Sequence, residues 1–305
     1  MGKILAICCR PENHDDFLAI AKRIIKKAPE IAVVIKPFIY HPDELDPALN
    51  HFPLLNIYLV NPPEKLPARG KTLQVKAIDK FEQIKQYAAA GIATPKTIEY
   101  ELGQPINKND WGEHVFIKSR TGSFSENSFL IPTKCILDIK PYFEKLRAED
   151  KFILQEFIYT GVNAISYRVL NFLGATLSFF SYTCLKPIYL PNNLDKAFNN
   201  DTVQTSFLNA KTTEKFEYNN EILDFSKKIF NVFSEKPIQG TDIIIDKKTN
   251  KLLALEANLG GNSWVFTKED WHSYKTLGRP ALLQQFNAFD IAADVLIKKT
   301  NELAI

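Results

Sequence analysis

Hydrophobic and polar residues follow two periodicities in the first 60 positions, and together these predict a small parallel α/β unit. Residues 14–28 carry apolar side chains at three- and four-residue spacing, as on an amphipathic helix. Residues 42–50 predict a short helical turn. Largely apolar runs that predict buried strands are residues 3–9, 31–38 and 54–60. Strands that alternate with helices favour a parallel sheet, and the proline-rich residues 61–72 then predict a linker.

The rest of the chain predicts antiparallel strands with interspersed helices. Alternation over residues 164–185 predicts two strands that turn at Gly174. Residues 186–219 are polar and poorly patterned, which predicts a long loop. Further expected strands are a short one after Pro95 and residues 114–118, 128–131, 151–158, 243–245 and 252–255. Expected helices run from about Asp79 to Gly91 and over roughly 135–149, 220–233 and 281–304.

Composition argues against several classes of protein. The formal net charge is +3 over 305 residues, without a basic block dense enough to follow a phosphate backbone, so nucleic acid is not an expected partner. No apolar stretch approaches the roughly 20 residues of a membrane span, so no membrane association is expected. The four cysteines match neither a disulfide framework nor a zinc-binding spacing. Reduced thiols, with no signal-peptide pattern, predict a cytoplasmic protein.

Residues 242–258 form an apolar hairpin whose strands end in acids. A turn centred on Thr249 would place Asp242 directly opposite Glu256, and Asn258 would lie on the same face two residues later. The expected pairs are Asp242 with Glu256, Ile243 with Leu255, and Ile245 with Leu253. Two carboxylates this close favour a cation between them, and an oxygen-only site suits Mg²⁺. Solvated strand ends are the alternative, and a one-residue slip in register would separate the acids.

Two lysines are candidates for binding phosphate. Lys118 ends the strand at residues 114–118 and precedes a loop of glycine and serine residues whose backbone amides could face an anion. Lys80 lies in the first turn of the helix that follows Asp79. Ordinary surface lysines are the alternative for both, because the chain has 38 basic residues.

Seven short motifs in order resemble the ATP-grasp superfamily. They are the pair Asp79-Lys80, "GIATP" at 91–95, "HVFIKSRTGS" from 114, "ILQEFI" from 153, "SYRVLNFLG" from 166, "GTDIIID" from 240 and "LEANLGG" from 255. The superfamily includes glutathione synthetase, D-alanine–D-alanine ligase and ribosomal-protein glutamate ligases, and the ending after Asn258 resembles a bacterial branch of it. The resemblance implies an α/β (α+β) fold with an N-terminal pre-ATP-grasp α/β domain at 1–75. The ATP-grasp domain at 76–305 would have subdomains of about 76–155 and about 156–305.

The resemblance also implies roles for individual residues. The metal ligands for Mg²⁺, with Mn²⁺ as the alternative ion, would be Asp242, Glu256 and Asn258. Lys80 and Lys118 would contact the ATP phosphates. The adenine would lie against Gln155, Glu156, Phe157 and Ile158. Ser166-Tyr167 replaces the acid that often binds the ribose in the superfamily, and Asn163 would be a weak substitute for it. Arg168 would lie beside the γ-phosphate and the acyl phosphate, so Arg168 and Lys118 are the catalytic candidates.

Other features of the site differ from the superfamily or stay open. Gly122 is the only glycine in residues 121–128, where the superfamily's phosphate-covering loop is usually richer in glycine. Gly260 and Gly261 could allow close approach of backbone to a substrate. Lys186 and Arg279 are candidates for contact with an anionic substrate, with ordinary surface charge as the alternative. Trp264 is expected to be a packing residue.

The function implied is an ATP- and Mg²⁺-dependent carboxylate–amine ligase. It would join a small-molecule or peptide carboxylate to an amine through an acyl phosphate and release ADP and phosphate. Two alternatives remain open: an ATP-grasp kinase that phosphorylates a hydroxyl, and an ATP-binding sensor or scaffold without turnover. A homodimer is the default expectation for the assembly.

Overall fold

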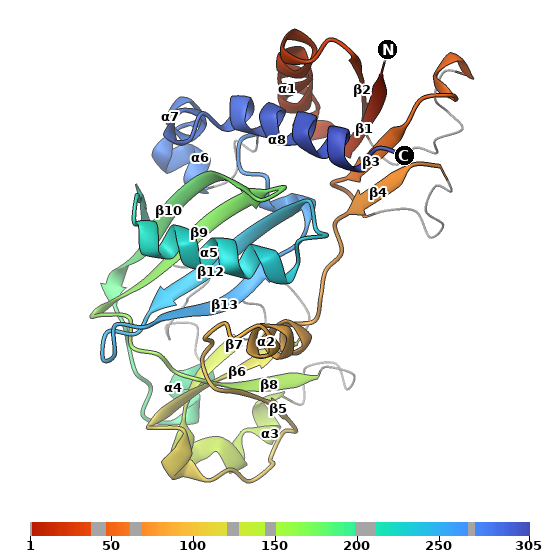
Figure 1. Ribbon diagram of the computed structural model, residues 1–305. Coiled ribbons are helices and arrows are strands. Elements are labelled where there is room, and N and C mark those ends of the chain that lie inside the picture. The colour runs from red at the N-terminus through yellow and green to blue at the C-terminus, as the bar shows by residue number, and fades with distance from the viewer. Residues whose placement is uncertain are drawn as a thin grey trace.

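The computed structural model describes residues 2–37, 47–61, 69–120, 128–143, 151–198, 212–267 and 272–305. Its strands form three sheets that follow one another along the molecule (Figure 1). We call them the N-terminal sheet, the middle sheet and the large sheet, in the order in which the chain forms them. In space the large sheet lies between the other two (Figure 1). No helix in these residues is long and apolar enough to cross a membrane.

The N-terminal sheet is parallel throughout, as the alternation of strands and helices predicts. Its strand order is β2-β1-β3-β4, and α1 (His14–Lys27) connects β1 to β2. The strands are β1 (Lys3–Cys9), β2 (Ile31–Pro37), β3 (Leu54–Tyr58) and β4 (Lys71–Gln74). Two 3₁₀ turns accompany them, at Pro11–Asn13 and at Pro47–Leu49. The linker expectation was wrong from Lys71 onward, because β4 is a short, half-polar edge strand with little apolar signal.

The middle sheet is antiparallel, with strand order β5-β8-β6-β7. Its strands are β5 (Thr97–Tyr100), β6 (His114–Ser119), β7 (Ser128–Pro132) and β8 (Phe152–Glu156). Helix α2 (Lys80–Ala89) precedes it and is followed by Gly91 at a φ of +69°. A 3₁₀ turn lies at Lys108–Asp110. The helix expected over 135–149 is, in its described part, a 3₁₀ stretch at Thr133–Asp138 and the short α3 (Lys140–Phe143).

The large sheet is also antiparallel and has the strand order β11-β10-β9-β12-β13. Its strands are β9 (Asn163–Phe172), β10 (Ala175–Pro187), β11 (Thr212–Phe216), β12 (Ile238–Ile245) and β13 (Leu252–Asn258). The turn between β9 and β10 at Gly174, with a φ of +95°, is confirmed. The stretch expected to be one long loop contains α4 (Leu194–Phe198) and β11; residues 199–211 lie outside the described part.

Helices cover both faces of the large sheet. Helix α5 (Asn220–Val232) packs on one face, against residues such as Val169 and Phe179. The neighbouring residues Leu170 and Phe180 point to the other face, where the C-terminal helices pack. These are α6 (His272–Leu277), α7 (Arg279–Gln285) and α8 (Ala288–Leu303). The single helix expected over 281–304 is broken because Asn287 adopts a left-handed conformation, with a φ of +50°.

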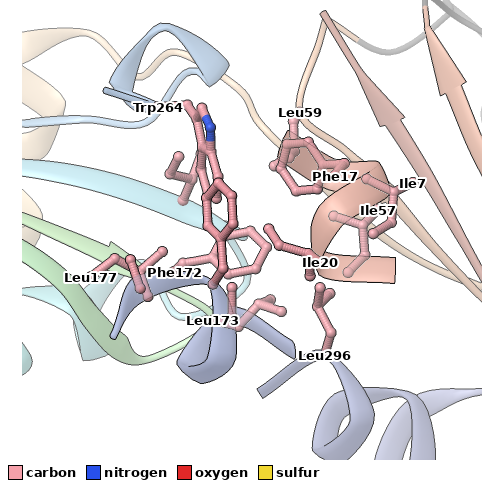
Figure 2. Packing of buried hydrophobic residues seen from close by; sticks show 14 of the residues in the cluster. Ile7, Phe17, Ile20, Ile57, Leu59, Phe172, Leu173, Leu177, Trp264 and Leu296 are labelled. Atoms are coloured by element: carbon pink, nitrogen blue, oxygen red, sulfur yellow. The ribbon is translucent and has the colours of Figure 1, made fainter. Parts of the chain in front are cut away.

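One hydrophobic cluster joins the N-terminal sheet to the large sheet. Trp264 lies at the centre of this cluster and is 1% exposed. Its ring centroid is 4.7 Å from that of Phe17 on α1 and 5.8 Å from that of Phe172 on β9 (Figure 2). Leu296 of α8 closes the same cluster. The expectation that Trp264 is a packing residue is confirmed. The predicted boundaries at residues 75 and 155 stay predictions; the last helix, α8, packs against α1 and thus lies beside the N-terminal sheet.

Candidate active site

A row of charged residues crosses three neighbouring strands of the large sheet. Arg168 on β9 pairs in register with Asp242 on β12, which pairs with Glu256 on β13. Directly paired residues point to the same face of a sheet, so one guanidinium and two carboxylates lie side by side. The predicted pairing of Asp242 with Glu256 is therefore confirmed.

The remainder of the predicted hairpin register was wrong by one residue. Ile243 pairs with Ala254 and Ile245 with Leu252, because the turn is built around the Asp246 side chain and a left-handed Asn250. A bulge between the Asp242 and Ile243 pairs restores the register. The extra residue is Leu255 on β13, and without it Asp242 would face Leu255 instead of Glu256. Bulges often re-aim side chains in this way beside functional sites.

Asp242 is the most constrained member of the row. The Arg168 Nε and Nη2 atoms donate to its two carboxylate oxygens at 2.7 and 2.6 Å, and the Asn258 amide donates to Oδ2 at 3.2 Å. Burial raises the pKa of Asp242 above its usual range, and the nearby Glu256 carboxylate adds to the increase despite the opposing effect of Arg168. Asp242 is therefore under electrostatic strain that a further cation would relieve.

Lys80 reaches the row from α2. The helix begins at Asp79, whose Oδ1 accepts the N–H groups of Phe81 and Glu82, and this cap fixes Lys80 at the first helical position. The Lys80 Nζ lies 3.8 Å from the Glu256 carboxylate. Arg120, which directly follows β6, donates to both Asp79 oxygens at 3.1 and 2.9 Å and so ties the helix start to the middle sheet.

Lys118 on β6 is the second predicted phosphate contact. Its ammonium donates to the Gln155 side chain at 2.6 Å and lies 4.8 Å from the centre of the Phe116 ring. Burial lowers its pKa to about 8, and the neighbouring charges of Glu256, Lys80 and Asp242 also act on it. The structure thus brings Lys118 and Lys80, predicted separately, to the carboxylates at the end of the hairpin.

The predicted adenine residues follow Lys118 across the middle sheet. Gln155 is 3% exposed. Its Oε1 accepts from the Lys118 ammonium and its Nε2 donates to Thr97 Oγ1, so the side chain holds the lysine in place. Glu156 accepts the backbone N–H of Lys96 at 3.3 Å and also bonds Lys96 through its own backbone N–H. Phe157 packs its ring against Phe116, 5.9 Å away, and Ile158 continues the chain beyond β8. Contact of these residues with adenine stays a prediction.

Asn163 stands at the first position of β9. Its amide nitrogen donates to the Cys184 carbonyl at 2.6 Å, a bond that ties β9 to β10. This contact is directed toward the hairpin itself, and a role in ribose binding stays a prediction.

The residues predicted to hold a metal fit a hard divalent ion. Asp242 and Glu256 are half-buried, with side chains 14% and 32% exposed, and Asn258 supplies an amide beside them. Among the described residues no group of three or more histidine, cysteine and acidic side chains is suited to a metal. Two carboxylates with one amide oxygen leave room for water and phosphate oxygens, which is the coordination that Mg²⁺ prefers.

Other candidates have been assigned by their contacts. Arg279 donates to the buried Asp16 at 2.6 Å and to the Phe266 carbonyl at 2.9 Å, so the structure gives it a structural partner. Lys186 is exposed near the end of β10. A side chain at Gly261 would clash with the carbonyl oxygen of Leu59, so the close approach observed there is to the residue that follows β3 in the same chain. Gly122 lies outside the described residues.

Two residues of this site were missed in the sequence. Gln83 lies one turn after Lys80 on α2 and bonds the backbone of Ala257, the residue between Glu256 and Asn258. Arg120 anchors Asp79, as described above. Spacing could have found Gln83, because residues three apart share a helix face, whereas Arg120 carries no spacing signal.

Comparison with known proteins identifies the fold. No protein-family model and no curated protein sequence matches the chain. Solved structures do match over nearly its whole length. The ATP-grasp ligase PsnB complexed with a minimal precursor has a TM-score of 0.55 at 13% identity, covering 98% of this chain and 100% of that one.

Two further matches have the same architecture. D-alanine–D-alanine ligase from Bacillus anthracis has a TM-score of 0.52 at 13% identity, with 99% of each chain covered. A Chryseobacterium gregarium RiPP-associated ATP-grasp ligase in complex with ADP and a leader and core peptide has a TM-score of 0.52 at 14% identity, covering 98% of this chain and 97% of that one. The fold is therefore the ATP-grasp fold, as the order of the sequence motifs implied.

Proposed function

We propose that the chain is an ATP- and Mg²⁺-dependent ligase that joins a carboxylate to an amine. The observation that carries the proposal is the convergence of Lys80, Lys118 and Arg168 on the facing carboxylates of Asp242 and Glu256. Three cations exceed two carboxylates by one charge, which suits a polyphosphate, whereas the paired acids suit the metal that accompanies it. The proteins of this fold named above are ligases; one is in complex with ADP and a leader and core peptide, and another is complexed with a minimal precursor.

The proposed chemistry has two balanced steps. An oxygen of the substrate carboxylate attacks the γ-phosphorus of ATP, the bond to the β-phosphate oxygen breaks, and ADP leaves. The amine then attacks the acyl carbon, and the bond from that carbon to the bridging oxygen breaks. Inorganic phosphate leaves with this oxygen and the electron pair of the bond, and the nitrogen loses a proton as the amide forms. Bound Mg²⁺ supplies charge neutralisation for the phosphates.

The protein's own residues have positioning and electrostatic tasks in this scheme. Lys80 and Lys118 bind phosphate oxygens, and Gln155 keeps Lys118 directed toward the site. Asp242, Glu256 and Asn258 are the proposed metal ligands. Arg168 neutralises Asp242 in the structure, and its guanidinium fork suits an acyl phosphate once the metal shares that carboxylate. Charge neutralisation and positioning carry the reaction, so no protein nucleophile is needed.

The substrate belongs to this proposal only as a class. It is a small molecule or a peptide that carries a carboxylate, together with a partner that carries an amine. All four cysteines lie in the described part of the chain and none forms a disulfide, which supports a reducing, cytoplasmic setting as part of the proposal.

Calorimetric titration of ATP, with and without Mg²⁺, tests the proposal. We expect Mg²⁺-dependent binding to the wild type and loss of that dependence in Glu256→Ala. The control is Asp224→Ala, which removes an exposed acid of α5 whose ion pair within the described residues is with Lys227. Absence of nucleotide binding under every metal condition would contradict the proposal.

Turnover separates the proposal from its alternatives. A screen of carboxylates and amines should release ADP only when both substrates are present. A phosphorylated product formed without an amine would indicate a kinase, and tight Mg·ATP binding with no turnover in any mixture would indicate a sensor or scaffold.

A further inference from the structure

The outer edge of β13 docks directly onto the segment that carries Lys80. β13 is the last strand of the large sheet, so the backbone groups on its free edge have no strand partner. The Ala254 N–H donates to the carbonyl of Ala93, in the chain between α2 and β5, at 2.9 Å. The Ala257 N–H donates to the Gln83 Oε1 at 2.8 Å, and the Gln83 Nε2 donates back to the Ala257 carbonyl at 3.1 Å.

The bulge at Leu255 makes this double docking possible. In a regular strand, backbone N–H groups point to the same edge only at every second residue. Ala254 and Ala257 are three residues apart, yet both donate away from β12. The extra residue therefore does two things: it places Glu256 opposite Asp242, and it turns the Ala257 amide toward α2.

The amide of Gln83 is fully engaged. Besides Ala257, its Nε2 donates to the Ile78 carbonyl at 3.0 Å, and Tyr87 donates its hydroxyl to Oε1 at 3.5 Å. The Gln83 side chain is 5% exposed, so no water competes freely for these groups. Gln83 therefore forms a two-point clamp on one backbone residue of β13.

The clamp joins the two halves of the candidate site. Ala257 lies between Glu256 and Asn258, and Gln83 lies one helical turn after Lys80 on α2. The helix that carries a phosphate lysine is thereby fixed to the strand that carries two proposed metal ligands. The Lys80 Nζ lies 3.8 Å from the Glu256 carboxylate, one helical turn from this attachment.

Resting on the function proposed above, we propose that Gln83 is a positioning residue that sets the metal affinity of the site. Its amide holds the Glu256–Ala257–Asn258 backbone so that both ligand side chains face the metal together with Asp242. Gln83 itself touches neither metal nor nucleotide. Residues of this kind, placed behind metal ligands, typically change metal affinity by about 10- to 100-fold when removed.

The chain contains a matched comparator for Gln83. Gln285 on α7 makes the same two-point clamp on Phe179 of β10, accepting its N–H at 2.9 Å and donating to its carbonyl at 2.6 Å. Gln285 also donates to the Glu217 carbonyl at 3.1 Å, as Gln83 does to Ile78. Both glutamines therefore attach a helix to the large sheet, but only Gln83 does so between metal ligands.

The experiment compares Gln83→Met with Gln285→Met in the full-length protein. Methionine preserves the length of the side chain and removes the amide. We would measure the midpoint of thermal unfolding without ligand, the affinity for ATP without metal, and the Mg²⁺ concentration that gives half-maximal enhancement of ATP binding. Calorimetry serves for the last two measurements.

We expect similar losses of thermal stability in both variants and a difference confined to the metal. The Mg²⁺ requirement should rise by about 10- to 100-fold in Gln83→Met and stay within about twofold of wild type in Gln285→Met. Gln83→Asn, whose amide is one methylene too short to reach both Ala257 groups, should show the same rise and serves if Gln83→Met does not fold.

The possible failures are distinguishable. An unchanged Mg²⁺ requirement in the folded Gln83 variants, with Mg²⁺-dependent ATP binding in the wild type, overturns the role of Gln83 alone. Equal rises in the Gln83 and Gln285 variants also overturn it, because the effect would then follow from lost stability. A wild type that shows no Mg²⁺-dependent ATP binding overturns the proposed function, and the role of Gln83 with it.

Discussion

Asp16 and Asp242 are aspartates that each accept an arginine, the first buried and the second half-buried, and their surroundings differ in one decisive respect. Asp16 on α1 is 1% exposed. Among the described residues, its carboxylate accepts hydrogen bonds from the Trp264 indole at 2.8 Å, the Thr267 hydroxyl, and Arg279 at 2.6 Å. Asp242 is matched by Arg168 and Asn258 but lies in a row with a second carboxylate, Glu256.

The difference separates a structural carboxylate from one suited to a ligand. The donors around Asp16 come from two segments distant in sequence, so its charge joins α1 to the loop after β13 and to α7. At Asp242 burial raises the pKa and the second carboxylate, Glu256, adds to the increase, so two neighbouring acids act on the one guanidinium of Arg168. A buried group that is fully satisfied stabilises the fold, whereas one left short of cations favours binding of a further cation.

The largest expected effect is on stability, in Asp16→Ala. This substitution leaves the Arg279 guanidinium and the Trp264 N–H without their acceptor, and breaking a buried ion pair in this way costs about 3 kcal/mol. Urea denaturation measures the loss. Asp15→Ala is the control, because the Asp15 side chain, next to Asp16 in the sequence, is 96% exposed and its removal should cost at most about 1 kcal/mol of helix-dipole stabilisation. Equal losses in the two variants would contradict a structural role for Asp16.

At Asp242 we expect the opposite balance: a smaller loss of stability and a larger loss of ligand binding. Asp242→Ala should cost less stability, about 1 kcal/mol, because Glu256 remains near Arg168 as a counter-charge and the repulsion between the carboxylates disappears. It should abolish the Mg²⁺ dependence of ATP binding, whereas Asp16→Ala should preserve it in the folded protein. Calorimetry at a temperature where both variants are folded makes the comparison, and a metal requirement retained in Asp242→Ala would remove the distinction between the two aspartates.

The surroundings of Asp242 and Asp16 can be predicted from the sequence only where the interacting residues are close together along the chain. Asp242 and Glu256 belong to one hairpin, so strand periodicity alone brought them together, although the compensating bulge at Leu255 was not foreseen. The backbone on either side of the bulge donates hydrogen bonds to Ala93 and Gln83, which are more than 150 residues away along the chain. No local pattern encodes such contacts.

The Asp16 centre was not predicted for the same physical reason. Its partners Trp264, Thr267 and Arg279 are about 250 residues away, and each alone has an ordinary surface or packing explanation. The break in the final helix at Asn287 was also missed, because its apolar spacing continues through the break while the backbone turns left-handed. Order of motifs, by contrast, indicated the fold correctly without any knowledge of long-range contacts.

A smaller effect should appear in the pH dependence of ATP binding at Lys118. Burial lowers its pKa from 10.5 to about 8, so the ammonium that binds phosphate is lost as the pH rises above 8. Affinity for ATP without metal should then fall by up to about tenfold per pH unit between pH 8 and 9. Calorimetry in matched buffers measures it, and Lys118→Met is the control that should lose this dependence.

The same pKa fixes the sign of a stability effect. Between about pH 8 and 10.5 the unfolded chain holds more protons on Lys118 than the folded chain does. The contribution of Lys118 to stability should therefore increase as the pH rises through this window, since its cost of burial is greatest when it is charged. A wild type that loses stability relative to Lys118→Met over the same window would contradict the assigned pKa shift.

The smallest expected effect distinguishes the two arginines. Arg279→Lys keeps the positive charge beside Asp16 but cannot also reach the Phe266 carbonyl, so it should cost about 1 kcal/mol in urea denaturation. Its affinity for ATP should equal that of the wild type, whereas Arg168→Lys should lose the two-point contact with Asp242 and slow ligation. Arg279→Lys could instead weaken binding of an anionic substrate and leave stability unchanged. Arg279 would then belong to the ligand site, and Asp16 would contribute to ligand binding as Asp242 is proposed to do.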